Sequence, residues 1–248
     1  MTHPMKAAIL AIKERGRAME NPYFAALRDG TFSREDFVET QIQFLFAVVF
    51  FSRPMMVLAA RLPRNEMRVG LLENVHDEHG DGNLTTSHER TFLELLSRLG
   101  VEPAEIEKRP LWPEVRAFNT TLTGLSLMDD PRTGLAALGM IEDLFSGISG
   151  ELGASILARG WLAEGEIVHY ATHEELDQEH AEDFYKPLYP EFDHPVAGYQ
   201  IEQGLELGAY IFLRMYRDLY EARARRWVRE IGGAHSAADG WRLPDQDG

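Results

Sequence analysis

Apolar residues recur at helical spacing along almost the whole chain. Ala8, Ile9 and Ile12 show this spacing in the first segment, and it returns in each later segment. Proline, glycine and asparagine interrupt the pattern, and Ser33, followed by acidic residues, is a helix-capping signal. The predicted helices cover residues 5–19, 33–62, 65–79, 86–99, 112–127, 132–159, 164–184 and 195–231.

These elements predict an all-α fold. No segment of useful length alternates with period two, so no strand is expected. The connections are short, which favours one bundle of about seven or eight helices. Asn65 and Asp130 are expected to cap two of the helices, and residues 22–30 are expected to form a short turn. We expect one domain over residues 1–231 and a polar tail over 232–248.

The most apolar stretch of the chain is Phe44–Phe51, with the sequence FLFAVVFF. Eight apolar residues are far fewer than the roughly 20 that a membrane-spanning helix needs. Arg53 and Pro54 follow closely and interrupt the run. The stretch is therefore expected to form a core helix, which is a candidate wall for an apolar pocket.

Composition then excludes several classes of protein. Lys and Arg number 25 against 40 Asp and Glu, so the net charge is −15, which argues against nucleic-acid and anionic-membrane partners. The chain has no cysteine, which excludes disulfides, cysteine-ligated metals and cysteine nucleophiles. The amino terminus has no apolar signal core, so a cytoplasmic location is expected.

The nine histidines are not scattered, and the sharpest cluster is His173-x-x-x-Asp177-x-x-His180. On a helix, Asp177 lies about 40° round from His173 and His180 about 20° the other way, so the three side chains share one stripe. Two imidazoles and a carboxylate on one stripe form half of a metal site, and oxygen ligands favour iron or manganese. The alternative is a solvated acidic helix face. His169 continues the stripe, where a surface or supporting role is favoured over ligation.

A second cluster lies around residues 73–88 and has two interpretations. Glu73-x-x-His76 matches the Glu-x-x-His element of ferritin-like diiron bundles. Alternatively, Glu78 and His88 bracket the break at Gly80. Glu73 and Glu78 are about 140° apart on a helix, so one stripe cannot present both. The spacing alone leaves both interpretations open.

A third candidate is Glu142, an acid within a mostly apolar helix. If Glu142 is buried, it needs a partner, and a metal ion would supply one. The alternative is an exposed acid at the edge of an amphipathic helix.

Together these residues resemble the haem-oxygenase-like diiron oxidases, which are also called iron-containing redox enzymes and are related to the TenA and PqqC proteins. The resemblance covers about residues 5–225. Its motifs are Asp77-Glu78-His79-Gly80-x-Gly82 with His88, then Glu142, then His173-x-x-x-Asp177-x-x-His180. Weaker support comes from Asn21-Pro22 and Leu27-x-x-Gly30-x-Phe32-x-x-Glu35.

The resemblance implies a pair of Fe(II) ions, O₂ as co-substrate and a specific ligand set. The implied iron ligands are Glu78, His88, Glu142, His173, Asp177 and His180. Asp81 is a lesser rival for Glu78. Some relatives carry a further carboxylate on the long second helix, where this chain has Glu39, Gln41 and Gln43.

The implied substrate is a small molecule with a carboxylate or an amine: a fatty acid, an amino acid or an amine. Arg53 is a candidate to bind a substrate carboxylate, because guanidinium binds carboxylate bidentately. Tyr210 and Arg214, one turn apart on the last helix, are similar candidates. A homodimer is the assembly to expect.

Three other functions compete with this interpretation. A metal-free TenA-like or PqqC-like enzyme would keep the fold, although the thiaminase nucleophile is excluded because cysteine is absent. Haem oxygenase proper needs an axial histidine on the first helix, and the candidate His3 precedes that helix. A non-catalytic interaction protein would use the acidic surface as its partner face.

Overall fold

The computed structural model describes residues 3–167, 169–170 and 180–229. Over these residues the chain forms helices and no strand, which confirms the all-α fold. The α-helices are α1 (Pro4–Gly16), α2 (Pro22–Asp29), α3 (Arg34–Arg61), α4 (Asn65–Glu78), α5 (His88–Arg98), α6 (Pro103–Glu107), α7 (Pro113–Met128), α8 (Pro131–Ala158) and α10 (Pro195–Ala222). Short 3-10 turns cover Ala18–Glu20, Glu164–Glu166 and Tyr189–Glu191.

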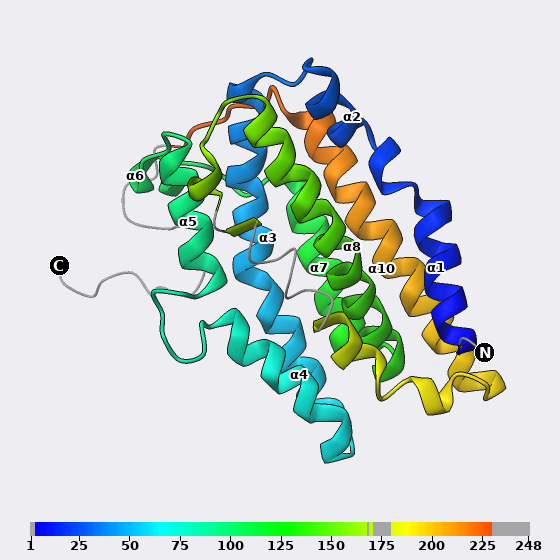
Figure 1. Cartoon of the computed structure of the whole chain (residues 1–248). Helices are drawn as coiled ribbons and strands as arrows, with labels where there is room; N and C mark the ends of the chain where they lie inside the picture. Colours follow the sequence, from blue (N-terminus) through cyan, green and yellow to red (C-terminus); the bar gives the residue numbers. More distant parts are fainter. Residues whose placement is uncertain (1–2, 168, 171–179, 230–248) are drawn as a thin grey trace.

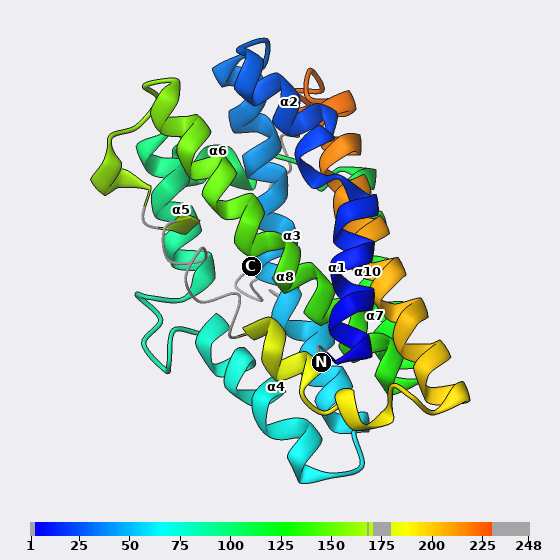
Figure 2. The same ribbon diagram turned by 45° about the vertical axis from the view of Figure 1, so that its right-hand side comes forward.

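Four long helices, α3, α7, α8 and α10, run side by side through the molecule (Figure 1). The most extensive contact joins α8 to α10, and α3 packs on α7. On the outside, α1 covers α10, whereas α4 and α5 each pack on α3. Figure 2 shows α4 and α5 on the opposite side of the bundle from α10. The bundle therefore has a long-helix core with α4 and α5 at its edge.

Two of the predicted helix caps are confirmed and one is wrong. The Ser33 side chain accepts a hydrogen bond from the Asp36 backbone N–H at 3.0 Å. Asp130 accepts one from the Arg132 N–H at 2.9 Å. Asn65 does not cap α4, because the helix begins at Asn65 itself and the preceding residue makes no side-chain capping bond.

The segment expected to be a turn at residues 22–30 is a helix, α2. Its cap is Asn21, whose side-chain oxygen accepts from the Tyr23 N–H at 3.1 Å. The side-chain amide of Asn21 also donates to the Leu213 carbonyl at 2.7 Å, which ties α2 to α10. Pro22 therefore opens a helix at its first position, where proline is well tolerated.

The last long helix is shorter than predicted, because it ends at Ala222 and not at residue 231. Beyond it, Arg225 forms an ion pair with Glu114 at 2.8 Å, and the Arg229 N–H donates to the Lys108 carbonyl at 2.7 Å. These contacts hold the segment after α10 against α7 and the end of α6. In the helix predicted over residues 164–184, residues 180–185 are helical, while residues 171–179 lie outside the described residues.

Helices α8 and α10 meet with their backbones almost in contact. A Cβ atom at Gly208 would lie 2.4 Å from the Ala137 carbonyl oxygen. At Gly204 it would lie 2.3 Å from the Thr133 carbonyl oxygen. The two glycines are one helical turn apart, so one side of α10 fits directly against α8. This contact anchors the first two turns of α8, and Glu142 lies in the following turns of the same helix.

Helix α3 is the core helix that the apolar run predicted. By length and composition alone α3 would pass as a membrane span, but 67% of its most apolar window is buried inside the bundle. Phe44, Phe46 and Leu45 all belong to the hydrophobic core. Side chains of α3 therefore reach into the interior next to α5, α7 and α8.

Candidate metal centre

The end of α4 and the start of α5 bring Glu78 next to His88. A left-handed turn ends α4, and its glycine, Gly80, has φ +68°. The chain then returns to Ser87, whose side chain caps α5 by accepting from the Arg90 N–H at 3.3 Å. The His88 Nδ1 atom lies 3.0 Å from the Glu78 Oε1 atom, and only about a tenth of each side chain is exposed.

Glu142 of α8 lines the same cavity as Glu78 and His88. It is 4% exposed, so the alternative of a surface acid does not hold. The cavity has a free volume of about 40 Å³. Most of its wall is apolar and comes from Phe44, Ala47, Val48 and Phe51 of α3, with Phe145 of α8 and Phe212 of α10. Two carboxylates and an imidazole thus meet in a small, largely apolar space.

His169, for which the sequence favoured a surface or supporting role, also lines this cavity and does not lie on the surface. It is 1% exposed, and its ring packs edge-on against Phe92 with centroids 4.7 Å apart. Its Nδ1 atom lies 2.9 Å from the Thr91 hydroxyl. The signal available in the sequence was its position four residues before His173, which places both histidines on one helical stripe.

His180 contacts α4 at Asp77, the residue that precedes Glu78. Its Nε2 atom lies 2.9 Å from the Asp77 Oδ2 atom, and its side chain is 7% exposed. Burial raises the pKa of the Asp77 carboxyl, and a hydrogen bond with Asp81 raises that pKa further, whereas the hydrogen bond with His180 lowers it. The other two predicted ligands, His173 and Asp177, lie outside the described residues.

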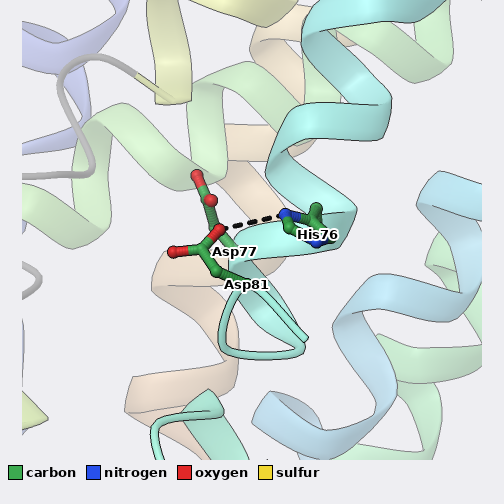
Figure 3. Close-up of side chains that lie close together, drawn as sticks. All are labelled: His76, Asp77 and Asp81. Carbon is green, nitrogen blue, oxygen red and sulfur yellow. Dashed lines mark ion pairs between the residues drawn. The ribbon is translucent and has the colours of Figure 1, made fainter. Parts of the chain in front are cut away.

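The residues of the rival interpretation, Glu73 and His76, lie on the surface of the structure, as does Asp81. The His76 Nδ1 atom pairs with the Asp81 Oδ1 atom at 3.0 Å, and their side chains are 62% and 72% exposed (Figure 3). Glu73 is also exposed. The structure therefore brings together Glu78, His88 and Glu142, and it does not bring Glu73, His76 or Asp81 into this cavity.

A scan against protein-family models matches residues 38–201 to a family described as iron-containing redox enzyme. The matched segment contains Glu78, His88, Glu142 and every other cavity residue except Phe212, and it is well over half of the chain. The chain belongs to the iron-containing redox enzyme family. A comparison with curated proteins found no match.

Solved structures similar to this member of the family share its fold at low sequence identity. A protein of unknown function with a heme oxygenase-like fold, from Shewanella denitrificans, is 14% identical with a TM-score of 0.73, covering 89% of this chain and 92% of that one. A CADD-like protein of unknown function from Nostoc punctiforme is 18% identical with a TM-score of 0.69, covering 88% and 96%. A TenA homologue from P. horikoshii is 14% identical with a TM-score of 0.68, covering 88% and 98%. These likenesses confirm the haem-oxygenase-like fold.

In this member of the family, the polar residues of α3 are used for structure. Glu39 pairs with Arg109 at 2.8 Å. The Gln41 amide donates to the Tyr23 hydroxyl at 2.7 Å, and Tyr170 donates to its carbonyl. The Gln43 amide donates to the Pro110 carbonyl at 3.0 Å. None of the three lines the cavity, so α3 contributes only apolar side chains to it.

The three predicted substrate residues also lie away from this cavity. Arg53 lines a separate pocket between α3 and α7, with Arg116 among its other residues. Tyr210 is 57% exposed on α10, and its hydroxyl accepts a hydrogen bond from Arg214 at 2.7 Å. A role for these residues in binding substrate stays a prediction. In that role they would contact a part of the substrate that lies outside the cavity.

The donor set fits iron. Glu78 and Glu142 provide carboxylate oxygens and His88 provides an imidazole nitrogen, which are the ligands that suit non-haem iron. Two acids in a largely apolar cavity are costly to bury unless positive charge balances them, and a cation would do so. A free volume of about 40 Å³ exceeds the space of roughly 10–15 Å³ that one water molecule needs.

The turn at Gly80 offers a test of how the site is assembled. In the variant Gly80→Ala, the added Cβ would lie 2.3 Å from the Asn83 carbonyl oxygen, at a positive φ that L-residues avoid. We expect a loss of at least about 2 kcal/mol in the free energy of unfolding, measured by urea denaturation. Gly100→Ala is the matched control, because it has φ +84° but no atom within 4 Å of the added Cβ. An equal loss in both variants would show that the turn has no special steric demand.

Proposed function

We propose that this chain is a non-haem diiron enzyme that uses O₂ to oxidise a small substrate bearing a carboxylate or an amine, such as a fatty acid, an amino acid or an amine. The observation that carries the proposal is the meeting of Glu78, His88 and Glu142 in one apolar cavity. Membership of the iron-containing redox enzyme family supports it. A cytoplasmic location and a homodimer are part of the same proposal.

In this proposal Glu78, His88, Glu142, His173, Asp177 and His180 hold the two ions. When bound, the ferrous ions supply the electrons that reduce O₂. The contact between the Glu78 carboxylate and the His88 Nδ1 atom holds the His88 ring in place beside the cavity before any ion binds. Phe44, Phe145 and Phe212 keep bulk water away from the carboxylates, which strengthens electrostatic interactions in the cavity.

The cavity wall suggests how a substrate would be oriented. Among the described residues, the lining includes no lysine or arginine. A carboxylate on the substrate would therefore stay outside, and the apolar part would point toward the ions. The small free volume would admit only the end of the apolar part of the substrate. The bond to be oxidised would therefore lie near that end.

Iron content after anaerobic loading with Fe(II) tests the proposal. We expect about two iron ions per chain in the wild-type protein and nearly complete loss in the double variant His173→Ala/His180→Ala. His79→Ala is the matched control, because His79 follows Glu78 in sequence but is exposed. Well below one iron per chain in a wild-type protein with normal helical circular dichroism would contradict the proposal and favour a metal-free enzyme of the TenA kind.

A further inference from the structure

Two consecutive carboxylates end α4, and each contacts a histidine of the proposed iron site. Glu78 contacts His88 at 3.0 Å, and Asp77 contacts His180 at 2.9 Å. The two acids differ in their positions: Glu78 lines the cavity and Asp77 does not. We propose that Asp77 is a positioning residue, which fixes the ring orientation and the tautomer of His180 for iron binding. The inference rests on the proposed function.

The geometry of the hydrogen bond determines which nitrogen can bind a metal. A carboxylate accepts hydrogen bonds, so the contact at 2.9 Å places the proton of a neutral His180 ring on Nε2. The lone pair then lies on Nδ1, which becomes the nitrogen for the ion. A histidine that binds a metal commonly donates its other N–H to a carboxylate, which orients the ring and raises the basicity of the ligand.

Asp77 is also placed to join two distant parts of the chain. It lies in the last turn of α4, and His180 is 103 residues later in sequence. His180 is 7% exposed, whereas Asp77 is 37% exposed, so the hydrogen bond connects the edge of the bundle to a buried ring. The same turn of α4 presents Glu78 to the cavity. One helix end therefore sets the positions of both histidines.

A competing interpretation is that the exposed residues around Asp77 bind a metal themselves. Ligand atoms of His76, Asp77 and Asp81 lie within 4.8 Å of one another. In Figure 3, the ion pair joins His76 to Asp81, while the Asp77 carboxylate points away from His76. Because Asp77 is bonded to a nearly buried histidine, we assign it to His180 and not to an exposed metal site.

The test is the affinity of the full-length protein for Fe(II), measured anaerobically by competition with a chromogenic chelator. We expect Asp77→Ala to weaken the affinity roughly 10–100-fold, which is the usual effect of losing such a hydrogen-bond partner. Asp77→Asn keeps an acceptor oxygen and should restore part of the affinity. Glu89→Ala removes an exposed carboxylate beside His88 and should change the affinity less than about twofold.

The other possible results distinguish a failure of this inference from a failure of the proposed function. If His180→Ala loses iron and a folded Asp77→Ala variant binds it like the wild type, the inference is wrong and the proposed function stands. If His180→Ala keeps its iron, the proposed function itself is wrong. If Asp81→Asn weakens binding as much as Asp77→Ala, the exposed cluster holds the metal and the inference is overturned.

A second measurement on the metal-free protein is independent of iron loading and of folding in the Asp77→Ala variant. Nitrogen-15 NMR of the labelled histidines reports which ring nitrogen carries the proton, and His180→Gln assigns the signal. We expect the wild-type His180 ring to carry its proton on Nε2. A proton predominantly on Nδ1 would overturn the inference.

Discussion

Glu142→Gln should remove most of the bound iron while leaving the helical bundle folded. Glu142 is 4% exposed and lies in the middle of α8, on the wall shared with Glu78 and His88. Glutamine has nearly the same shape and still offers a hydrogen-bond acceptor, so the core packing is preserved. Its neutral amide is a far weaker ligand for iron than a carboxylate. We expect iron content after anaerobic loading to fall from about two ions per chain to below one.

The control for this variant is Glu151→Gln on the same helix. Glu151 pairs with Arg28 at 3.1 Å on the surface, and such a pair contributes at most about 1 kcal/mol to stability. Its iron content should equal that of the wild type. If Glu142→Gln retains both ions with normal circular dichroism, Glu142 is not a ligand. The meeting of Glu78, His88 and Glu142 in one cavity would then no longer support the proposed function.

Gly208→Val in α10 should produce a large loss of folding stability. The Cβ atom at this position would lie 2.4 Å from the Ala137 carbonyl oxygen and 2.9 Å from the Ala137 Cα atom, both of which are backbone atoms. Neither can move without separating α10 from α8, the most extensive helix pair in the bundle. We expect a loss of at least about 3 kcal/mol. Thermal denaturation should show a fall of roughly 6–12 °C.

Gly147→Ala in α8 is the opposite case and serves as the control. Gly147 is exposed, and no atom lies within 4 Å of the added Cβ. Alanine in a helix interior is favoured over glycine by about 0.5–1 kcal/mol, so this variant should be slightly more stable than the wild type. Equal stability of Gly208→Val and the wild type would mean that α8 and α10 do not meet this closely.

Local chemistry explains which parts of the fold the sequence could predict. Ser33 and Asp130 cap helices through bonds to residues two or three positions away, so the residues needed for the prediction are adjacent in sequence. The end of α10 depends instead on Glu114, which lies 111 residues from Arg225. No local pattern could have indicated that pairing, and the predicted helix was therefore too long.

The candidate site shows the same limit. Spacing alone could not choose between Glu73 with His76 and Glu78 with His88, because both pairs fit a helix or a helix end. In the structure the choice depends on where α8 lies, since Glu142 shares a cavity with Glu78 and His88. The burial of His169 likewise depends on packing against Phe92 of α5, which sequence spacing does not reveal.

The position of α4 and α5 at the edge of the bundle has a thermodynamic consequence. Each helix packs on α3 and only slightly on the other, and their adjoining ends hold Glu78 and His88. An ion bound by both residues and by Glu142 would tie this edge to α8 in the core. Binding energy for the ion would then add directly to the free energy of local opening of α4 and α5. Iron would act as a crosslink whose occupancy governs the lifetime of the folded edge, in addition to any role in chemistry.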